Sequence, residues 1–270
     1  MMRTLVALAT VCVASRGGAA RAQWTSPPSG WEPSAKAAAA NAFTVVYVPP
    51  KAERLKPWME LAHVLAMEKI ATTLNERFKM PRPLPIVFLQ CDTVNAFYTP
   101  DKHAILACYE ILEYFYNLFK PTAKTDNEIG RKIAGAFFFT FFHELGHALA
   151  GELDLPITGK EEDAADQLAS IVLARIPGVG RECALAAAQW FAIEGESKQK
   201  ANKIVWYDEH SFDLQRMYDI LCVIYGYNQT ANADLVQAVG MSADRQARCV
   251  RETPKKVKAW DELLRAHVRR

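Results

Sequence analysis

The sequence has almost no net charge. It contains 32 Lys and Arg, 30 Asp and Glu and six His among 270 residues, which gives a formal charge of +2. This balance gives no indication of a nucleic-acid partner or of an anionic membrane surface as a partner, because both favour a strong basic excess. A locally basic segment runs from Arg245 to Arg270. We interpret it as the solvated face of a helix.

Neither of the two most apolar segments is long enough to cross a bilayer, which needs about 20 apolar residues. Thr4–Ser15 follows a positively charged start, and Ala20-Arg21-Ala22 forms a small-x-small cleavage site. Residues 1–22 are therefore predicted to be a cleaved signal peptide, cut after Ala22. Ile133–Phe142 is followed at once by ionisable residues and predicts a buried helix. We expect a secreted or periplasmic protein with no stable membrane insertion.

No two of the cysteines that follow the predicted signal peptide have the spacing of a zinc knuckle. These cysteines are Cys91, Cys108, Cys183, Cys222 and Cys249. Their spacing argues against a cysteine zinc site. In an oxidising compartment, five cysteines indicate one or two disulfides and a remaining thiol.

Strand signals come early in the chain and helix signals later. Strands are predicted at 42–48, 85–89 and 103–108, with a helix over 53–78 and turn residues over 95–102. Beyond Tyr109 the pattern is helical, so we predict an α+β fold in which a sheet of about three strands precedes a helical bundle. Residues 23–40 are predicted to be a flexible leader, and 41–270 a single domain.

The motif with the clearest chemistry is His143-Glu144-x-x-His147, or H-E-x-x-H. Residues four apart on a helix are offset by about 40°, so both imidazoles leave one face and can share a metal ion. Zinc accepts imidazole nitrogens, and a catalytic zinc site has three protein ligands plus water. Glu144 points about 100° around the helix, where its carboxylate could take a proton from that water. Such a spacing is rare by chance with six histidines, which disfavours two core histidines bonded to backbone.

The third ligand is not fixed by spacing alone. No histidine follows in the pattern H-E-x-x-H-x-x-G-x-x-H, since Gly151 and Asp154 do not match it, which argues against the metzincin type. Acidic residues begin a second predicted helix at 159–174. Its apolar stripe passes nearest Glu161, with Glu162 at its edge, so the periodicity allows either glutamate and mildly favours Glu161.

H-E-x-x-H followed by E-x-x-A-D, Glu162–Asp166, resembles the glutamate-ligand zinc peptidases called gluzincins. In those families the glutamate of the second motif binds zinc, and the aspartate four residues later holds a ligand histidine by a hydrogen bond. The resemblance implies a zincin-like fold and a single Zn²⁺ ion. It implies that Glu162 binds the ion with His143 and His147, and that Asp166 orients one of the histidines.

Other segments extend this resemblance. Asn95–Tyr98 and the following 103–110 are similar to the hairpin that precedes the zinc helix in such enzymes, where an extended substrate pairs with the edge strand. With Trp206–Arg216, Tyr225-Gly226 and Arg248-Cys249, the chain from about Ala42 to Leu264 is similar to a bacterial family of uncharacterised metallopeptidases. The resemblance implies a peptide or protein substrate bound as an extended strand.

His210 precedes a predicted helix. In related peptidases a histidine in this region lies near the active site and could donate a hydrogen bond to the oxyanion, which makes His210 a second catalytic candidate. Alternatively, Asp208 or Ser211 caps the helix and His210 is exposed. Arg216, on the same predicted helix, is expected to form a buried ion pair.

Four cysteines are predicted to pair. Cys91 and Cys108 flank the predicted hairpin, where a disulfide would brace the edge strand. Cys222 with Cys249 is the second predicted pair, which leaves Cys183 free. Sequence alone does not determine this connectivity.

These features together predict a zinc-dependent endopeptidase of gluzincin type. His143, His147 and Glu162 are the predicted metal ligands, and Glu144 is the predicted general base. Two alternatives stay open: a catalytically silent, zinc-stabilised binding or scaffold domain of the same fold, and a zinc hydrolase of a non-peptide amide.

Overall fold

The computed structural model describes residues 42–202, 205 and 208–269, so the predicted signal peptide and leader lie outside the described residues. The four strands are β1 (Val45–Tyr47), β2 (Ile86–Leu89), β3 (Ala96–Thr99) and β4 (Ala104–Cys108). The helices are α1 (Lys56–Val64), α2 (Met67–Arg77), α3 (Tyr109–Phe119), α4 (Asp126–Glu152), α5 (Glu161–Arg175), α6 (Val179–Lys200), α7 (Asp213–Tyr227), α8 (Gln229–Ala238) and α9 (Ala243–Leu263). Short 3-10 helices lie at Glu53–Leu55 and Arg265–His267. The predicted α+β class, with a small sheet followed by helices, is confirmed.

The sheet has the strand order β1-β2-β4-β3, with β3 at one edge. β1, β2 and β4 are parallel, and β3 is antiparallel to β4 in a register that opposes Tyr98 to Ile105. We expected a sheet of about three strands, and the sheet has four. The additional strand is β3, which lies inside the segment predicted as turn. A four-residue run containing Phe97, Tyr98 and Thr99 has strand propensity, and the turn that follows is only four residues long.

The prediction of one continuous helix over 53–78 was wrong, because this segment forms two helices, α1 and α2. Ala66 has a φ of 53°, a left-handed conformation that interrupts the helical hydrogen bonds. The break lets two differently oriented helices bury apolar side chains in one core, Trp58 from α1 and Met67 and Ile70 from α2. The apolar residues keep a uniform helical spacing across the break, so the sequence pattern did not predict it.

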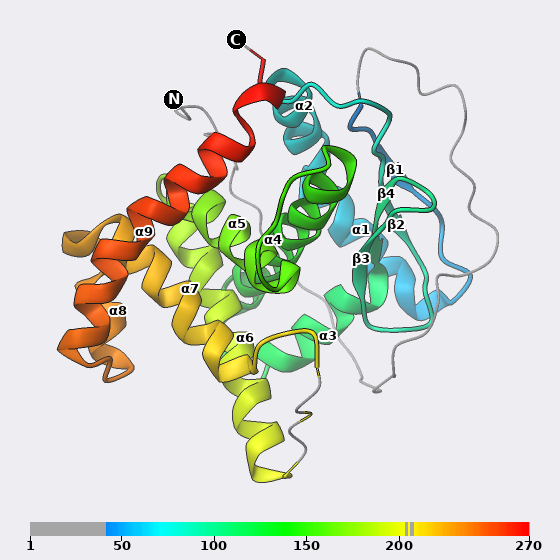
Figure 1. The fold of residues 1–270 in the computed structure, drawn as a ribbon. Helices are drawn as coiled ribbons and strands as arrows, with labels where there is room; N and C mark the ends of the chain where they lie inside the picture. The colour runs from blue at the N-terminus through cyan, green and yellow to red at the C-terminus, as the bar shows by residue number, and fades with distance from the viewer. Residues whose placement is uncertain (1–41, 203–204, 206–207, 270) are drawn as a thin grey trace.

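α4 is the central helix of the fold and lies between the sheet and the other long helices (Figure 1). It packs against α5 and α6 on one side and against β3 and β4 on the other. By length and composition it could cross a membrane, but 89% of its most apolar window is buried inside the protein. The ionisable residues of H-E-x-x-H are thus held within a packed core helix.

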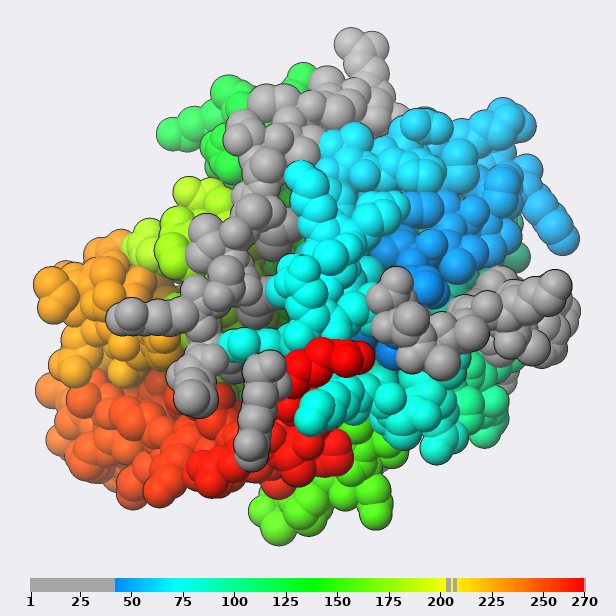
Figure 2. Space-filling view, turned by 90° about the horizontal axis from the view of Figure 1, so that it is seen from above, coloured from blue at the N-terminus to red at the C-terminus, as the bar shows by residue number. Residues whose placement is uncertain are grey.

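The C-terminal end of the described chain lies against the end of α2. Figure 2 shows the red C-terminal residues beside the cyan end of α2. Phe78 and Val268 form an isolated antiparallel bridge, and the N–H of Lys79 donates to the carbonyl of His267 at 2.7 Å. These contacts tie the segment after α9 to the N-terminal part of the fold.

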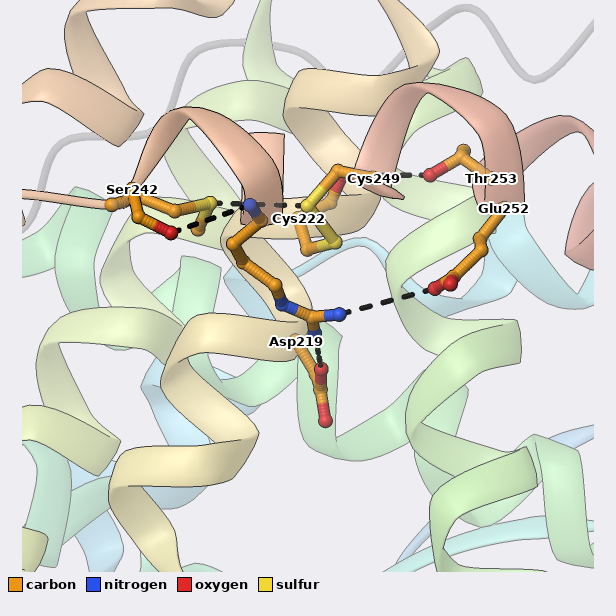
Figure 3. The surroundings of a disulfide bond; sticks show 8 residues. Asp219, Cys222, Ser242, Cys249, Glu252 and Thr253 are labelled. Carbon is orange, nitrogen blue, oxygen red and sulfur yellow. Dashed lines mark hydrogen bonds and ion pairs between the residues drawn. A yellow bond between two sulfur atoms is a disulfide. The ribbon is translucent and has the colours of Figure 1, made fainter. Parts of the chain in front are cut away.

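Both predicted disulfides are confirmed. Cys91 and Cys108 are joined with their Cα atoms 5.4 Å apart, and Cys222 and Cys249 with theirs 5.1 Å apart. The second bond links α7 to α9, and Asp219 and Glu252 lie close to it on the same helices (Figure 3). Cys183 is free and buried, as expected. Two disulfides indicate an oxidising environment, extracellular or periplasmic.

Candidate metal centre

His143 and His147 project from one face of α4 toward a common point. Their Nε2 atoms lie 3.1 Å apart, and their ring centroids 4.8 Å apart. This is the arrangement that the i, i+4 spacing predicts for a single helix face. His143 is buried, and His147 is partly buried.

The first turn of α5 brings a carboxylate to the same point. Oε2 of Glu162 lies 3.1 Å from Nε2 of His143, and Oε1 lies 3.4 Å from Nε2 of His147. The three residues each offer a ligand atom within 4.8 Å of the others. Glu161 lies elsewhere, with Oε1 2.7 Å from Nδ1 of His147 and a half-exposed side chain. Of the two glutamates that the periodicity allowed, Glu162 is the one facing both Nε2 atoms.

Asp166, one turn further along α5, holds the other side of His143. Its Oδ1 lies 2.7 Å from Nδ1 of His143. Arg216 of α7 donates two hydrogen bonds to the same carboxylate, 2.7 and 2.8 Å long, and its guanidinium lies 4.1 Å from the Phe191 ring centroid. Burial alone would raise the pKa of Asp166, but the charge of Arg216 and the hydrogen bond to His143 hold it well below its usual range. The buried ion pair expected for Arg216 is thus present, with Asp166 as its partner.

The hydrogen-bond partners of the two imidazoles determine what their inner nitrogens can do. An ionised carboxylate can only accept, so His143 and His147 carry their hydrogen on Nδ1, opposite Asp166 and Glu161. Their Nε2 lone pairs then face each other and the Glu162 carboxylate. Three electron-rich groups at this separation need a cation or a shared proton among them. The donor set therefore fits a divalent metal ion.

The pKa values of the same residues also indicate that a positive charge is stabilised between them. Burial lowers the pKa of His143, but its hydrogen bonds to Asp166 and Glu162 outweigh burial and raise the pKa to about 10. Burial opposes ionisation of Glu162, but hydrogen bonds from His143, His147 and His210 hold its pKa well below the usual range. The cluster thus stabilises positive charge at its centre.

Glu144 lies beside this cluster and is buried. Its Oε1 lies 4.0 Å from Nε2 of His143, and its Oε2 accepts a 2.8 Å hydrogen bond from the main-chain N–H of Tyr98 on β3. Burial raises the pKa of Glu144, although the neighbouring histidines and the Tyr98 N–H act in the opposite direction. A carboxylate with a raised pKa holds a transferred proton more readily than an exposed one.

His210 reaches the centre from the segment before α7. Its Nε2 lies 2.7 Å from Oε2 of Glu162, and its ring stacks against His143 at 6.0 Å between centroids. Its Nδ1 lies 3.2 Å from Asp208. The side chain of His210 is only 26% exposed and contacts Glu162, so it is not the merely exposed histidine of the alternative interpretation. Ser211 is also engaged elsewhere, because its hydroxyl donates to Asp163 at 2.7 Å.

Sequence reasoning missed two features of the site. The main-chain N–H of Tyr98 binds Glu144. This contact depends on where β3 lies, so no pattern of side chains in the sequence predicts it. A second group of polar side chains around Glu152, at the end of α4, was also not predicted.

The site combines a buried H-E-x-x-H helix, a glutamate from the next helix and an adjacent edge strand, and it forms a candidate metal centre. The chain belongs to a protein family described as "putative metallopeptidase", whose family model matches residues 47–264. This confirms the predicted resemblance to a family of metallopeptidases, and the matched residues lie within the predicted range of about 42–264. Searches of curated proteins and of solved structures found no match.

Proposed function

We propose that this protein is a zinc-dependent endopeptidase that acts in an oxidising compartment. The observation that carries the proposal is the convergence of His143, His147 and Glu162, with Glu144 beside them on the same helix. Family membership supports a peptidase, and the two disulfides support the compartment.

His143, His147 and Glu162 would hold the metal ion. Two imidazole nitrogens and one carboxylate are a donor set that suits zinc and leaves a position open for catalysis. When bound, the ion would supply a Lewis acid that polarises the scissile carbonyl and makes an attacking water more acidic. Asp166, held by Arg216, keeps the His143 ring in the tautomer that offers Nε2 as a ligand.

Glu144 would carry the proton. Its carboxylate takes a proton from water as the water oxygen adds to the scissile carbonyl, and then passes this proton to the departing amine nitrogen. The Tyr98 N–H fixes one carboxylate oxygen, which leaves the other for the transfer. Nε2 of His210 lies against Oε2 of Glu162, and it would exchange this contact for a hydrogen bond to the oxyanion that forms at the carbonyl.

The substrate would lie as an extended strand along β3. This strand is at the edge of the sheet and packs against α4, so a peptide paired with it would pass the metal centre. In an antiparallel pair, main-chain groups alternate between facing the neighbouring strand and facing outward. The N–H of Tyr98 faces outward to Glu144, which identifies the side of β3 that meets the site.

Metal analysis of the purified mature protein, combined with a peptide-library cleavage assay with and without a chelator, tests the proposal. We expect about one equivalent of zinc, cleavage within peptides, and loss of cleavage on chelation. Glu144→Gln is the matched variant, because it keeps the size and one acceptor oxygen and should bind zinc but not cleave. Zinc without cleavage of any peptide would favour the silent scaffold. Turnover by a metal-replete Glu144→Gln protein would remove Glu144 from the mechanism.

A further inference from the structure

A second polar cluster lies at the C-terminal end of α4, two turns beyond Glu144. At its centre is the carboxylate of Glu152, whose side chain is 1% exposed. Tyr98 donates its hydroxyl to Oε1 of Glu152 at 2.8 Å, and Nδ1 of His103 lies 2.7 Å from the same oxygen. Nε of Arg82 lies 3.1 Å from Oε2. We call Glu152, Tyr98, His103 and Arg82 the Glu152 cluster.

The groups of the cluster pack closely against Glu152 and against the backbone of α4. A buried carboxylate is costly unless it is paired and hydrogen-bonded, and three groups from outside α4 meet that requirement here. A Cβ at Gly151 would lie 3.2 Å from Cε1 of Tyr98, so the ring rests directly on the helix backbone. His103 has a φ of 48°, which few residues other than glycine adopt, in the turn between β3 and β4.

Tyr98 joins this cluster to the metal centre. Its main-chain N–H binds Glu144, and its hydroxyl binds Glu152, so one residue contacts two carboxylates of the same helix. These glutamates are eight positions apart, or about 12 Å along the helix axis. A residue attached at both ends cannot slide along the helix or tilt away from it without breaking one of the two bonds.

We propose that Glu152 is a positioning residue: it anchors the hydroxyl of Tyr98 so that the Tyr98 N–H stays against Glu144. Arg82 compensates the charge of Glu152, and the contact of His103 with the same carboxylate holds the turn after β3 to this anchor. Glu152 thus sets the distance between the edge strand and the proton-carrying carboxylate. The consequence for turnover rests on the proposed peptidase function, whereas the effect on β3 does not.

Tyr98→Phe tests this inference, because it removes only the hydroxyl that reaches Glu152. Hydrogen exchange followed by NMR reports the amide at position 98, and steady-state kinetics report kcat and KM separately. We expect amide exchange at position 98 to accelerate at least fivefold or so. We expect kcat to fall about tenfold while KM changes less than about twofold, since a shift in Glu144 affects proton transfer more than binding. Zinc content should stay unchanged.

Tyr114→Phe is the matched control. Tyr114 is also partly buried and also donates its hydroxyl to a glutamate, Glu194, at 2.6 Å, but it links α3 to α6 instead of β3 to α4. This variant should leave both the exchange at position 98 and kcat as in the wild type. Glu152→Gln, which keeps an acceptor oxygen for Tyr98, should retain more protection at position 98 than Glu152→Ala.

Wild-type exchange at position 98 in Tyr98→Phe would overturn the anchor. Faster exchange with an unchanged kcat would overturn the positioning of Glu144 and leave the proposed function intact. If the wild-type protein cleaves no peptide, the proposed function fails, and the exchange measurement alone decides whether Glu152 anchors β3. Recovery of protection in Glu152→Gln but not in Glu152→Ala would support the inference even where one variant folds poorly.

Discussion

Arg216 of α7 binds both carboxylate oxygens of Asp166 on α5, with Nε to Oδ2 at 2.7 Å and Nη2 to Oδ1 at 2.8 Å. Asp166 in turn holds Nδ1 of His143 on α4. Three helices are therefore connected through one carboxylate, and the far end of this connection is a candidate metal ligand. A planar guanidinium suits such a bidentate contact better than a lysine ammonium does.

Arg216→Lys should weaken zinc binding while the fold survives. Lysine keeps the charge but not the two parallel hydrogen bonds, so Asp166 would hold His143 less firmly. We expect zinc affinity to fall between about tenfold and 100-fold, as for other partners of ligand histidines. Competition with a chromophoric chelator measures it.

The control for this substitution is Arg175→Lys, also made at a helix-to-helix pair. Arg175 binds both oxygens of Asp261, at 2.9 and 2.7 Å, and its side chain is 9% exposed against 11% for Arg216. It connects α5 to α9 instead of to the ligand histidine. Equal zinc affinity in the two variants would show that Arg216 acts only on the fold.

The metal centre was predictable where a single helix sets the geometry. The spacing of His143 and His147 placed both imidazoles on one face, and the structure has them there. The choice between Glu161 and Glu162 was not predictable from periodicity, because α5 begins at Glu161 and its first turn approaches α4 from an angle that only tertiary packing determines. The resemblance favoured Glu162, the glutamate that faces both Nε2 atoms.

Features that depend on long-range pairing could not be predicted from the sequence. β3 is a short edge strand whose pairing with β4 decides its conformation, so its residues resembled a turn. The break at Ala66 lies in a run whose apolar spacing is compatible with a continuous helix. The contact of Tyr98 with Glu144 uses a main-chain N–H, for which side-chain identity carries no signal.

Two single substitutions should separate the roles of the neighbouring glutamates. Glu162→Gln removes a carboxylate that faces both Nε2 atoms and should lower zinc affinity by at least about 100-fold. Glu161→Gln alters only the partner of Nδ1 of His147, and it should cost about tenfold or less. Isothermal titration with zinc measures both. The reverse order of effects would make Glu161 the ligand.

The thiol of Cys183 should be inert in the native protein. Burial raises its pKa from 9.0 to about 12, and the side chain lies in the packed core. We expect no alkylation by iodoacetamide at pH 8 over hours, and full alkylation once the chain is unfolded. Rapid labelling of the native protein, followed by peptide mass spectrometry, would contradict this expectation.

The same shift in pKa has a consequence for stability. Between pH 9.0 and about 12 the folded thiol keeps a proton that the unfolded thiol has lost, so the folded state binds more protons. The free energy of unfolding therefore falls as the pH rises through that window. Urea unfolding at pH 8 and at pH 10.5 should show a smaller alkaline loss for Cys183→Ala than for the wild type.

Gly146, between Glu144 and His147, should be needed for the approach of α5. A Cβ at this position would lie 2.9 Å from Cα and 3.1 Å from Cβ of Ala165, closer than side chains tolerate. Gly146→Ala would improve helix propensity by up to about 1 kcal/mol but would push the helices apart. Overpacking of this kind costs about 1 to 3 kcal/mol, so we expect a net loss of stability in urea unfolding.

The effect of Gly146→Ala on the metal centre can be isolated with Gly135→Ala. Gly135 is on the same helix, and its Cβ would lie 2.9 Å from Cα of Cys183 on α6, away from the ligand residues. Both variants should lose similar stability with a chelator present, because both overpack a helix contact. Only Gly146→Ala moves α5, and with it Glu162, relative to His143, so only this variant should lose zinc affinity, by about tenfold or more. Equal zinc affinity in both variants would mean that the spacing of α4 and α5 does not control the metal centre.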